Sequence, residues 1–469
     1  MLLKRILFFV LSVSVIAQGE LLPSEPLGLQ REGLVYTLTA GFFDHFNLTN
    51  VDEDYDDIIK VDISQSKISE STQILRPGLT RGCLRHELNC FKNKNLVYYL
   101  TYRLQPLLMR QQPRHLVFVV PGFGGRNDSG LSEYLIEVLS SWGLAVAVFD
   151  SPASKRFITE TSQYGVPGIQ ILDADELYQG MVLARKELEQ KVGAHFKYDK
   201  VSIIGTSLGG LNAQLIQLIQ LIQQKERETK EKETKSTQLD FFRVISVNPP
   251  LQNKYGLTLI DQMISDYFKR PIVNSFNGLK SLLGYIPISF SSFDELNEFA
   301  LSLQTSNITV PEARHLIGMS FYETVRGALD GYRLRYPLVA DKKMYSQIVT
   351  FHDLFNQITI PHLQKNNKLI VDKRLSELMK IINSSSRFQL DGRLLNRDSI
   401  LQNYAALNLS EGYRVMTFDD DFLVNQEDLE FMQVSMNKKI HVYTGGGGHL
   451  GGLYRADFQK DLKNELLAD

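Results

Sequence analysis

Cysteine is nearly absent from the sequence, since the 469 residues contain only Cys83 and Cys90. In an oxidising compartment the two could close a small disulfide loop, and two free thiols are the alternative. A metal site at this pair is disfavoured because His86 is the only further soft ligand nearby.

A surplus of charge of either sign is also missing, since the formal net charge is −2 at pH 7. Without a basic excess to neutralise phosphates, the composition argues against nucleic-acid binding, and it gives no sign of electrostatic docking to a membrane. An acidic stretch at residues 51–57 lacks the glycine and the spaced oxygen ligands of a calcium loop, so we interpret it as a solvated loop. We expect neither a metal nor any other cofactor.

Long apolar runs are absent beyond the N-terminal region, so we expect no transmembrane segment in the mature chain. The N-terminal region itself has the order of a secretory signal peptide: Lys4 and Arg5, then an apolar stretch, then the small residue Ala17. We expect cleavage before Gln18, which makes residues 1–17 the signal peptide and the protein an exported one, periplasmic or secreted. An uncleaved membrane anchor is the alternative.

The chain does contain enough apolar residues, 43% hydrophobic and 10% aromatic, for a well-filled globular core. Apolar runs typical of buried strands alternate with helical patterns, which is the signature of βαβ units and a parallel sheet. Two runs rich in Val and Tyr, at residues 33–39 and 95–102, are expected to be N-terminal edge strands. The other expected strands are residues 116–120, 144–149, the run that leads into Ser207, 242–247, 413–418 and 439–443, and the expected helices between them are residues 131–142, 173–192 and 208–224.

Between residues 251 and 410 the strand rhythm stops and helical patterns dominate. We interpret this block as a helical cap or lid inserted into a sheet domain whose two parts are residues 18–250 and 411–469. The helices expected within the block are residues 257–268, 293–303, 311–329, 345–355 and 373–382.

The most informative motif is Gly-Thr-Ser-Leu-Gly at residues 205–209, which directly follows an apolar run. A glycine-flanked serine after a strand is what a sharp strand-to-helix turn needs, because only residues without a bulky Cβ fit beside the strained serine. Such a turn points the Ser207 hydroxyl outward above the end of the sheet. The pattern alone arises often by chance, so its meaning depends on the rest of the chain.

A base for Ser207 is available in His449, which lies in the glycine-rich stretch 445–452 after the last expected strand. Glycines allow a loop tight enough to bring an imidazole over the edge of the sheet toward the serine. Among the other histidines, His441 is the nearest competitor, but it lies inside the strand itself.

An acid to orient the base is expected among Asp419, Asp420 and Asp421, which follow the strand at residues 413–418. A carboxylate in this loop could accept the imidazole Nδ1–H and hold the correct tautomer. We prefer Asp421 because it stands three residues before the apolar Val424, which would tuck under the loop. Asp420 is the second candidate.

Oxyanion donors are expected from two backbone N–H groups, those of Leu208 and Phe123. Phe123 belongs to Pro-Gly-Phe-Gly-Gly at residues 121–125, where a glycine on each side allows close approach to a substrate carbonyl. An ordinary turn at the end of a strand is the alternative interpretation.

With these motifs in this order, the chain resembles the α/β-hydrolase family over residues ~95–250 and ~411–469. The resemblance rests on Pro-Gly-Phe-Gly-Gly, Gly-Thr-Ser-Leu-Gly-Gly, Asp-Asp-Asp-Phe-Leu-Val and Gly-Gly-His-Leu-Gly. It implies a mostly parallel, eight-stranded sheet with helices on both faces, a helical cap after the sixth strand, and catalytic residues in the order Ser207, Asp421, His449. The chain departs from the family at Pro121, where many members have histidine.

From the residues and this resemblance we expect an exported serine hydrolase that cleaves a carboxylic ester through an acyl-enzyme. Phe123, Phe290 and Phe293, together with the apolar helices, favour an acyl or lipid-like substrate. A peptidase or amidase is the enzymatic alternative, because the triad does not choose the leaving group. A non-catalytic binding protein of the same fold is the alternative from another class, although such proteins usually lack the nucleophile or the base.

Overall fold

The computed structural model describes residues 29–40, 98–101, 115–127, 129–162, 167–191, 198–230, 239–250, 253–269, 293–336, 347–359, 361 and 410–468. Several expectations fall on other parts of the chain: the signal peptide at 1–17, the acidic stretch at 51–57, Cys83 and Cys90, and the helix at 373–382 lie outside the described residues.

Seven strands of the described residues form one sheet in the order β1-β3-β2-β4-β5-β6-β7. β1 runs antiparallel to β3, and every other neighbouring pair is parallel. The predicted mostly parallel sheet is therefore confirmed, whereas the expected eighth strand is not among the described residues. The strands are β1 (Tyr98–Thr101), β2 (His115–Val120), β3 (Ala145–Phe149), β4 (Lys200–Thr206), β5 (Arg243–Val247), β6 (Tyr413–Phe418) and β7 (Ile440–Tyr443).

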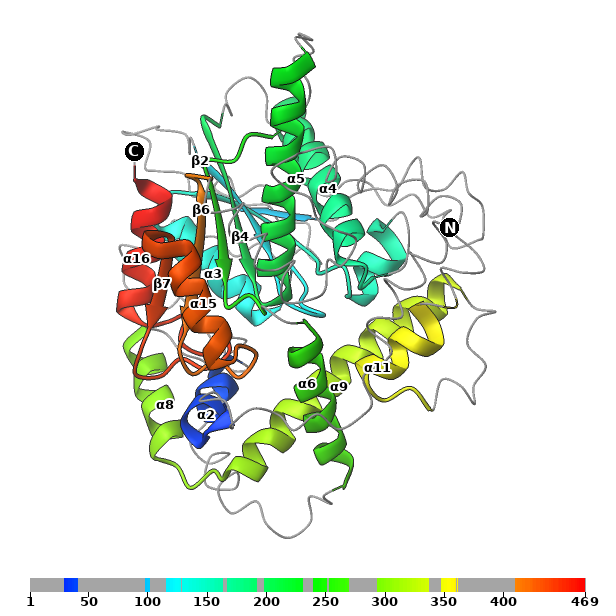
Figure 1. Cartoon of the computed structure of the whole chain (residues 1–469), viewed down its shortest axis with the longest axis vertical. Coiled ribbons are helices and arrows are strands. Elements are labelled where there is room, and N and C mark those ends of the chain that lie inside the picture. The colour runs from blue at the N-terminus through cyan, green and yellow to red at the C-terminus, as the bar shows by residue number, and fades with distance from the viewer. Residues whose placement is uncertain are drawn as a thin grey trace.

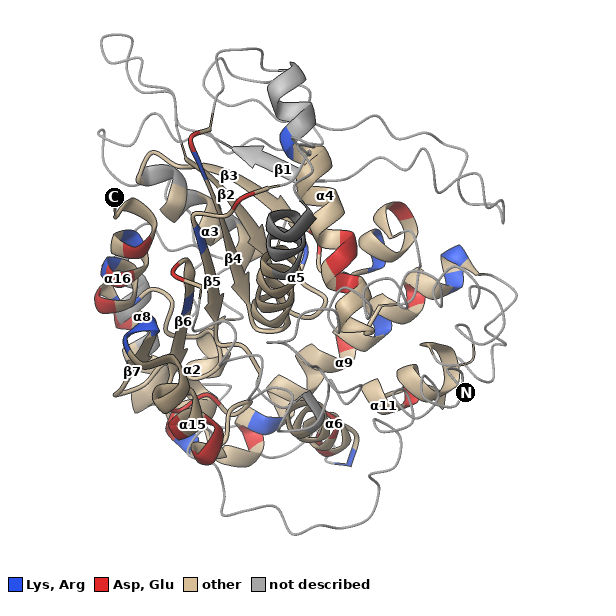
Figure 2. Cartoon of the chain, turned by 45° about the horizontal axis from the view of Figure 1, so that its top comes forward, with Lys and Arg blue, Asp and Glu red and all other residues tan. Residues whose placement is uncertain are grey.

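Helices cover both faces of the sheet (Figure 1), with α3 (Gly130–Ser141) and α16 (Ala456–Leu467) on one face and α4 (Gln170–Lys191), α5 (Leu208–Lys230) and α15 (Gln426–Met436) on the other. An apolar core lies on each face of the sheet. In β2, Val117 and Val119 belong to the core on the α3 face, and Leu116 and Phe118 belong to the core on the α5 face. Since side chains of a strand alternate between faces, a strand buried on both faces is apolar throughout. Figure 2 agrees with this burial: the charged residues lie mostly on the outer helices, and the strands are mostly tan.

Between β5 and β6 the described chain is helical, as the sequence predicts: α6 (Asn253–Lys269), α8 (Phe293–Thr305), α9 (Val310–Arg335) and α11 (Phe351–Leu354), which continues as a π-helical turn over Phe355–Thr359. Figure 1 shows α6 and α9 below the end of the sheet where β4 passes into α5, which is the carboxyl end of the parallel strands. Among all described residues, no helix is both long and apolar enough to cross a bilayer. The cap itself, with boundaries at 251 and 410, stays a prediction.

The expected edge strand at residues 33–39 is wrong, because this segment forms helix α2 (Arg31–Thr39). Leu34 and Val35 are fully buried in the apolar core, and the helix packs against α8 and α9. Tertiary burial of one helix face thus overrides the preference of Val, Tyr and Thr for strands. The second expected edge strand is confirmed in part, since β1 (Tyr98–Thr101) lies within residues 95–102.

Candidate active site

Ser207 occupies a sharp turn between β4 and α5, with the left-handed backbone angle φ of 53°. A Cβ at Gly205 would overlap with the backbone of Gly209, and a Cβ at Gly209 would overlap with the carbonyl oxygen of Val120. Glycine is therefore required at both positions, because neighbouring backbone atoms lie too close for a side chain. The strained conformation is the one expected for a serine presented at the end of a sheet.

His449 follows β7 and directs its ring toward Ser207, with 2.7 Å between Nε2 and the serine Oγ. The ring packs at a steep angle against Phe422, with 5.6 Å between the ring centroids. The imidazole and the serine side chain are both buried, at 5% and 8% exposure of the whole residue. The competing histidine, His441, instead contacts Glu465 of α16 through its Nε2 at 3.1 Å.

Asp421 lies on the other side of the imidazole, with its two carboxylate oxygens 3.0 and 2.9 Å from Nδ1 of His449. The residue is fully buried, and two further donors fix the carboxylate. The side-chain amide of Asn248 donates to Oδ2 at 2.6 Å, and the backbone N–H of Leu423 donates to Oδ1 at 2.9 Å. These hydrogen bonds hold the carboxylate in place beside Nδ1 of the imidazole.

Asp420, the second candidate for the acid, points to the backbone of the histidine loop rather than to the ring. Its carboxylate accepts the N–H groups of Gly448 at 2.8 Å and Gly447 at 3.2 Å. Burial raises the pKa of Asp420, and these two backbone hydrogen bonds oppose the shift. Burial also raises the pKa of Asp419. The three consecutive carboxylates thus have three different surroundings, and only Asp421 contacts the imidazole.

The two expected oxyanion donors lie at the start of α5 and in the turn after β2. Leu208 is the first residue of α5, so its N–H has no acceptor within the helix. Gly122 lies directly against the nucleophile, because an added Cβ there would be 2.9 Å from the Cβ of Ser207. Within the described residues, neither the Leu208 nor the Phe123 N–H donates to another backbone or side-chain group. The assignment of both N–H groups as oxyanion donors stays a prediction.

Sequence reasoning missed Asp150 at the end of β3, which binds the chain at Asn127, shortly after the turn that contains Phe123. Its Oδ1 accepts the backbone N–H of Asn127 at 2.8 Å, and its Oδ2 accepts from Nε of Arg156 at 2.6 Å. The Asp150 side chain is 1% exposed and its Arg156 partner is only 25% exposed. The one available signal was an aspartate directly after the apolar run at residues 144–149.

Aromatic side chains from the helical block cover this turn. The ring of Phe123 meets that of Phe351 with 4.3 Å between centroids, and Phe351 meets Phe321 of α9 at 6.4 Å. An apolar wall therefore lies beside the expected oxyanion donor. Of the other two phenylalanines expected near the substrate, Phe290 lies outside the described residues, and Phe293 begins α8 without a described side chain.

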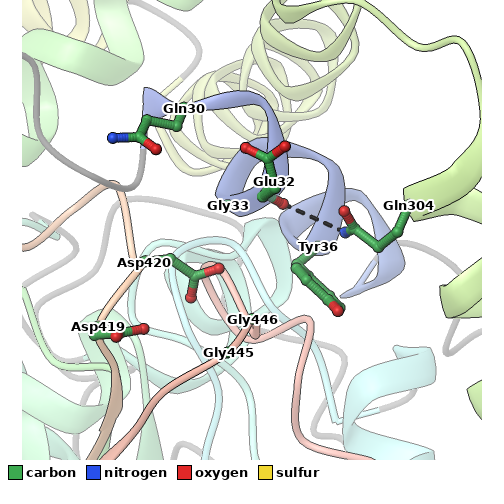
Figure 3. A pocket seen from close by; sticks show the side chains of 9 residues that line it. All are labelled: Gln30, Glu32, Gly33, Tyr36, Gln304, Asp419, Asp420, Gly445 and Gly446. Carbon is green, nitrogen blue, oxygen red and sulfur yellow. Dashed lines mark hydrogen bonds between the residues drawn. The ribbon is translucent and has the colours of Figure 1, made fainter.

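A pocket of about 490 Å³ lies beside the histidine loop but does not include Ser207 or His449 (Figure 3). It is lined by Gln30, Glu32, Gly33, Tyr36, Gln304, Asp419, Asp420, Gly445 and Gly446. In the part of the chain that the structure describes, no group of three or more His, Cys, Asp or Glu side chains is arranged to hold a metal ion.

The strand order, the strained serine after β4 and the buried chain from Ser207 through His449 to Asp421 together define an α/β-hydrolase fold. No family model matches the sequence, and no curated protein matches it.

Solved structures with a similar fold include an esterase from Pyrococcus furiosus, at 12% identity and a TM-score of 0.35, covering 85% of this chain and 98% of the other. A peroxisomal α/β-hydrolase from Saccharomyces cerevisiae is 11% identical with a TM-score of 0.38, covering 86% and 91%. A proline iminopeptidase from Mycobacterium smegmatis is 13% identical with a TM-score of 0.34, covering 81% and 98%. The likeness concerns the fold alone.

Proposed function

We propose that the protein is an exported serine hydrolase that cleaves a carboxylic ester with an apolar acyl group. The observation that carries the proposal is the hydrogen-bonded chain Ser207–His449–Asp421, with 2.7 Å between Ser207 Oγ and His449 Nε2 and 2.9 Å between His449 Nδ1 and Asp421 Oδ2. A protein that only binds a ligand does not need a strained serine, an imidazole and a buried carboxylate joined by hydrogen bonds in this order.

In the proposed reaction, Ser207 Oγ attacks the ester carbonyl while Nε2 of His449 takes the hydroxyl proton. Asp421 accepts the Nδ1–H and stabilises the imidazolium that forms. The negative charge on the carbonyl oxygen is stabilised by the N–H groups of Phe123 and Leu208, the second of which also carries the positive end of the α5 dipole.

The tetrahedral intermediate then collapses, the bond to the alcohol oxygen breaks, and His449 returns its proton to that oxygen. The released alcohol leaves an acyl group on Ser207. Water attacks this acyl-enzyme by the same steps, with His449 again as the base, and yields the carboxylic acid and the free serine.

A fluorophosphonate probe tests the proposal directly, because it reacts with an activated serine. We expect the folded wild-type protein to be labelled, and Ser207→Ala and His449→Ala to lose the label. His441→Gln is the matched control and should be labelled like the wild type, because His441 contacts Glu465 and not Ser207. A folded wild-type protein that stays unlabelled would contradict the proposal.

The substrate class is tested with p-nitrophenyl esters of increasing acyl length and with aminoacyl anilides. Turnover of the esters, increasing with acyl length, is the expected result because aromatic rings flank Phe123. Phe351→Ala should then weaken the preference for the longer esters, visible as a rise of KM by several-fold. Faster turnover of the anilides would show a peptidase or amidase instead.

The proposed export is tested by producing the chain from Met1 in a secreting bacterial host and measuring the mass of the recovered protein. A mature protein that begins at Gln18 is the expected result. A full-length chain recovered with the membrane would show an uncleaved anchor.

A further inference from the structure

The loop that carries His449 is held from two sides. From the turn that follows β6, the carboxylate of Asp420 accepts the N–H groups of Gly447 and Gly448. From helix α2, the hydroxyl oxygen of Thr37 accepts the backbone N–H of His449 at 2.8 Å. This second contact joins residues 412 positions apart in the chain.

The Thr37 hydroxyl donates one hydrogen bond and accepts another. It donates its proton to the carbonyl oxygen of Gly33, one turn earlier in α2, at 2.8 Å. Its lone pairs are thereby left to accept the N–H of His449. An apolar side chain of the same shape could make neither bond and would leave a buried N–H without an acceptor.

Glycines of the histidine loop allow α2 to approach it at backbone distance. A Cβ at Gly448 would overlap with the carbonyl oxygen of Gly33, and a Cβ at Gly451 would overlap with the carbonyl oxygen of Tyr36. Gly448 also has a positive φ of 54°. The position of the histidine backbone is therefore set by direct contact with the backbone of α2.

Helix α2 is itself firmly anchored to the helical block. The guanidinium of Arg31 donates to the carbonyl oxygens of Ile308 at 2.8 Å and Gln304 at 3.0 Å, and also to that of Ser306. Leu34 and Val35 are fully buried in the same apolar core as Leu450 and Leu453, which follow His449. A movement of α2 would therefore be transmitted to the histidine loop.

We propose that Thr37 is a positioning residue for the general base, and that α2 is the element that keeps His449 in register with Ser207. The inference rests on the proposed hydrolase function. Displacements of about 1 Å in a catalytic group can cost a hundredfold in rate, so one backbone hydrogen bond at the histidine is enough to affect turnover. Thr37 does not contact Ser207, so its effect should fall on kcat and not on substrate binding.

Three variants of α2 test the proposal. Thr37→Val keeps the shape of the side chain and removes the hydroxyl, and Thr37→Ser keeps the hydroxyl. Thr39→Val is the matched control, because Thr39 is a fully buried threonine of the same helix whose hydroxyl has no hydrogen-bond partner within the described structure. For each variant, kcat and KM are measured on a p-nitrophenyl ester, and the number of active sites is counted by fluorophosphonate titration.

For Thr37→Val we expect kcat per titrated site to fall about 10-fold while KM stays within about twofold. Thr37→Ser should restore kcat to within about twofold, and Thr39→Val should equal the wild type. Unchanged kcat in Thr37→Val, or no rescue by Thr37→Ser, would overturn the proposal.

If Thr37→Val does not fold, Arg31→Ala takes its place, since it leaves the hydroxyl intact and loosens only the anchor of α2. An unchanged kcat in folded Arg31→Ala would then overturn the role of the helix. Failure of the proposed function would look different, because the wild-type protein itself would neither hydrolyse the ester nor react with the probe.

Discussion

The substitution Asp421→Asn probes the proposed catalytic chain at its most buried point. The carboxylate accepts hydrogen bonds on both oxygens: Leu423 N–H donates to Oδ1, Asn248 Nδ2 donates to Oδ2, and His449 Nδ1 lies within 3.0 Å of both. An asparagine has the same shape but only one acceptor oxygen, so in either orientation its NH₂ group faces a donor.

The cost of this change can be worked out from these contacts. The oxygen that remains can still hold one donor, but the negative charge that stabilises the imidazolium in the transition state is gone. Loss of the correct tautomer and of that charge predicts a fall in kcat/KM of about 10³- to 10⁴-fold, which corresponds to about 4–5.5 kcal/mol of transition-state stabilisation.

The assay compares Asp421→Asn with Asp420→Asn, measuring kcat/KM on the best ester and the rate of fluorophosphonate labelling. Asp420 holds the backbone of Gly447 and Gly448, so its substitution should loosen the loop and cost only about 10-fold. Circular dichroism confirms that both variants are folded. A larger loss in Asp420→Asn than in Asp421→Asn, or a loss under 10-fold in Asp421→Asn, would refute the reasoning.

Three further predictions concern stability and are measured by chemical denaturation. Gly209→Ala should lower the free energy of unfolding by more than ~3 kcal/mol or prevent folding, because its Cβ would overlap with the carbonyl oxygen of Val120. Gly327→Ala, inside α9 with nothing within 4 Å of an added Cβ, should instead raise it by about 0.5–1 kcal/mol, and a loss would contradict this account. Burial raises the pKa of Asp261 in the folded protein to about 6, above its unfolded value of about 3.9, so folding favours the protonated acid. This contribution to stability is complete below about pH 4 and is lost as the pH rises through 6, by about 3 kcal/mol at most, whereas Asp261→Asn should lack this slope. Equal pH slopes in the two proteins would show that Asp261 does not titrate in this way.

The sheet could be predicted from the sequence because its strands are buried on both faces. A run such as residues 116–120 is apolar at every position, and no solvent-facing alternation competes with that pattern. Helix α2 could not be predicted in the same way. Its Val and Tyr content favours a strand locally, and the helix is stabilised by contacts with α8 and α9, which lie far along the chain.

The candidate site shows the same division between local and distant causes. The requirement for Gly205 is local, because the backbone of Gly209 in the same turn lies against it, whereas Gly209 is required because the carbonyl oxygen of Val120 at the end of β2 lies against it. The roles of Asp150 and Thr37 depend on partners in other segments, Asn127 and Arg156 for the first and His449 for the second. The sequence places Asp150 directly after an apolar run, but it does not show these distant partners.

The three consecutive aspartates show most clearly where local reasoning stops. Successive side chains in a turn point in different directions, so only one of three neighbours can face a given partner. The N–H of Asp421 donates to the carbonyl of Phe418, which closes a turn directly after β6, and the N–H of Val424 donates back to the carbonyl of Asp421. These bonds turn Asp421 inward beside Val424, as the spacing to that apolar residue suggested, and leave Asp420 facing the loop backbone. Because Gly448 donates its N–H to Asp420 on one side and lies against the backbone of α2 on the other, the choice of acid and the position of the base are parts of one arrangement. A change at either Asp420 or Thr37 should therefore reach Ser207 only through the placement of His449.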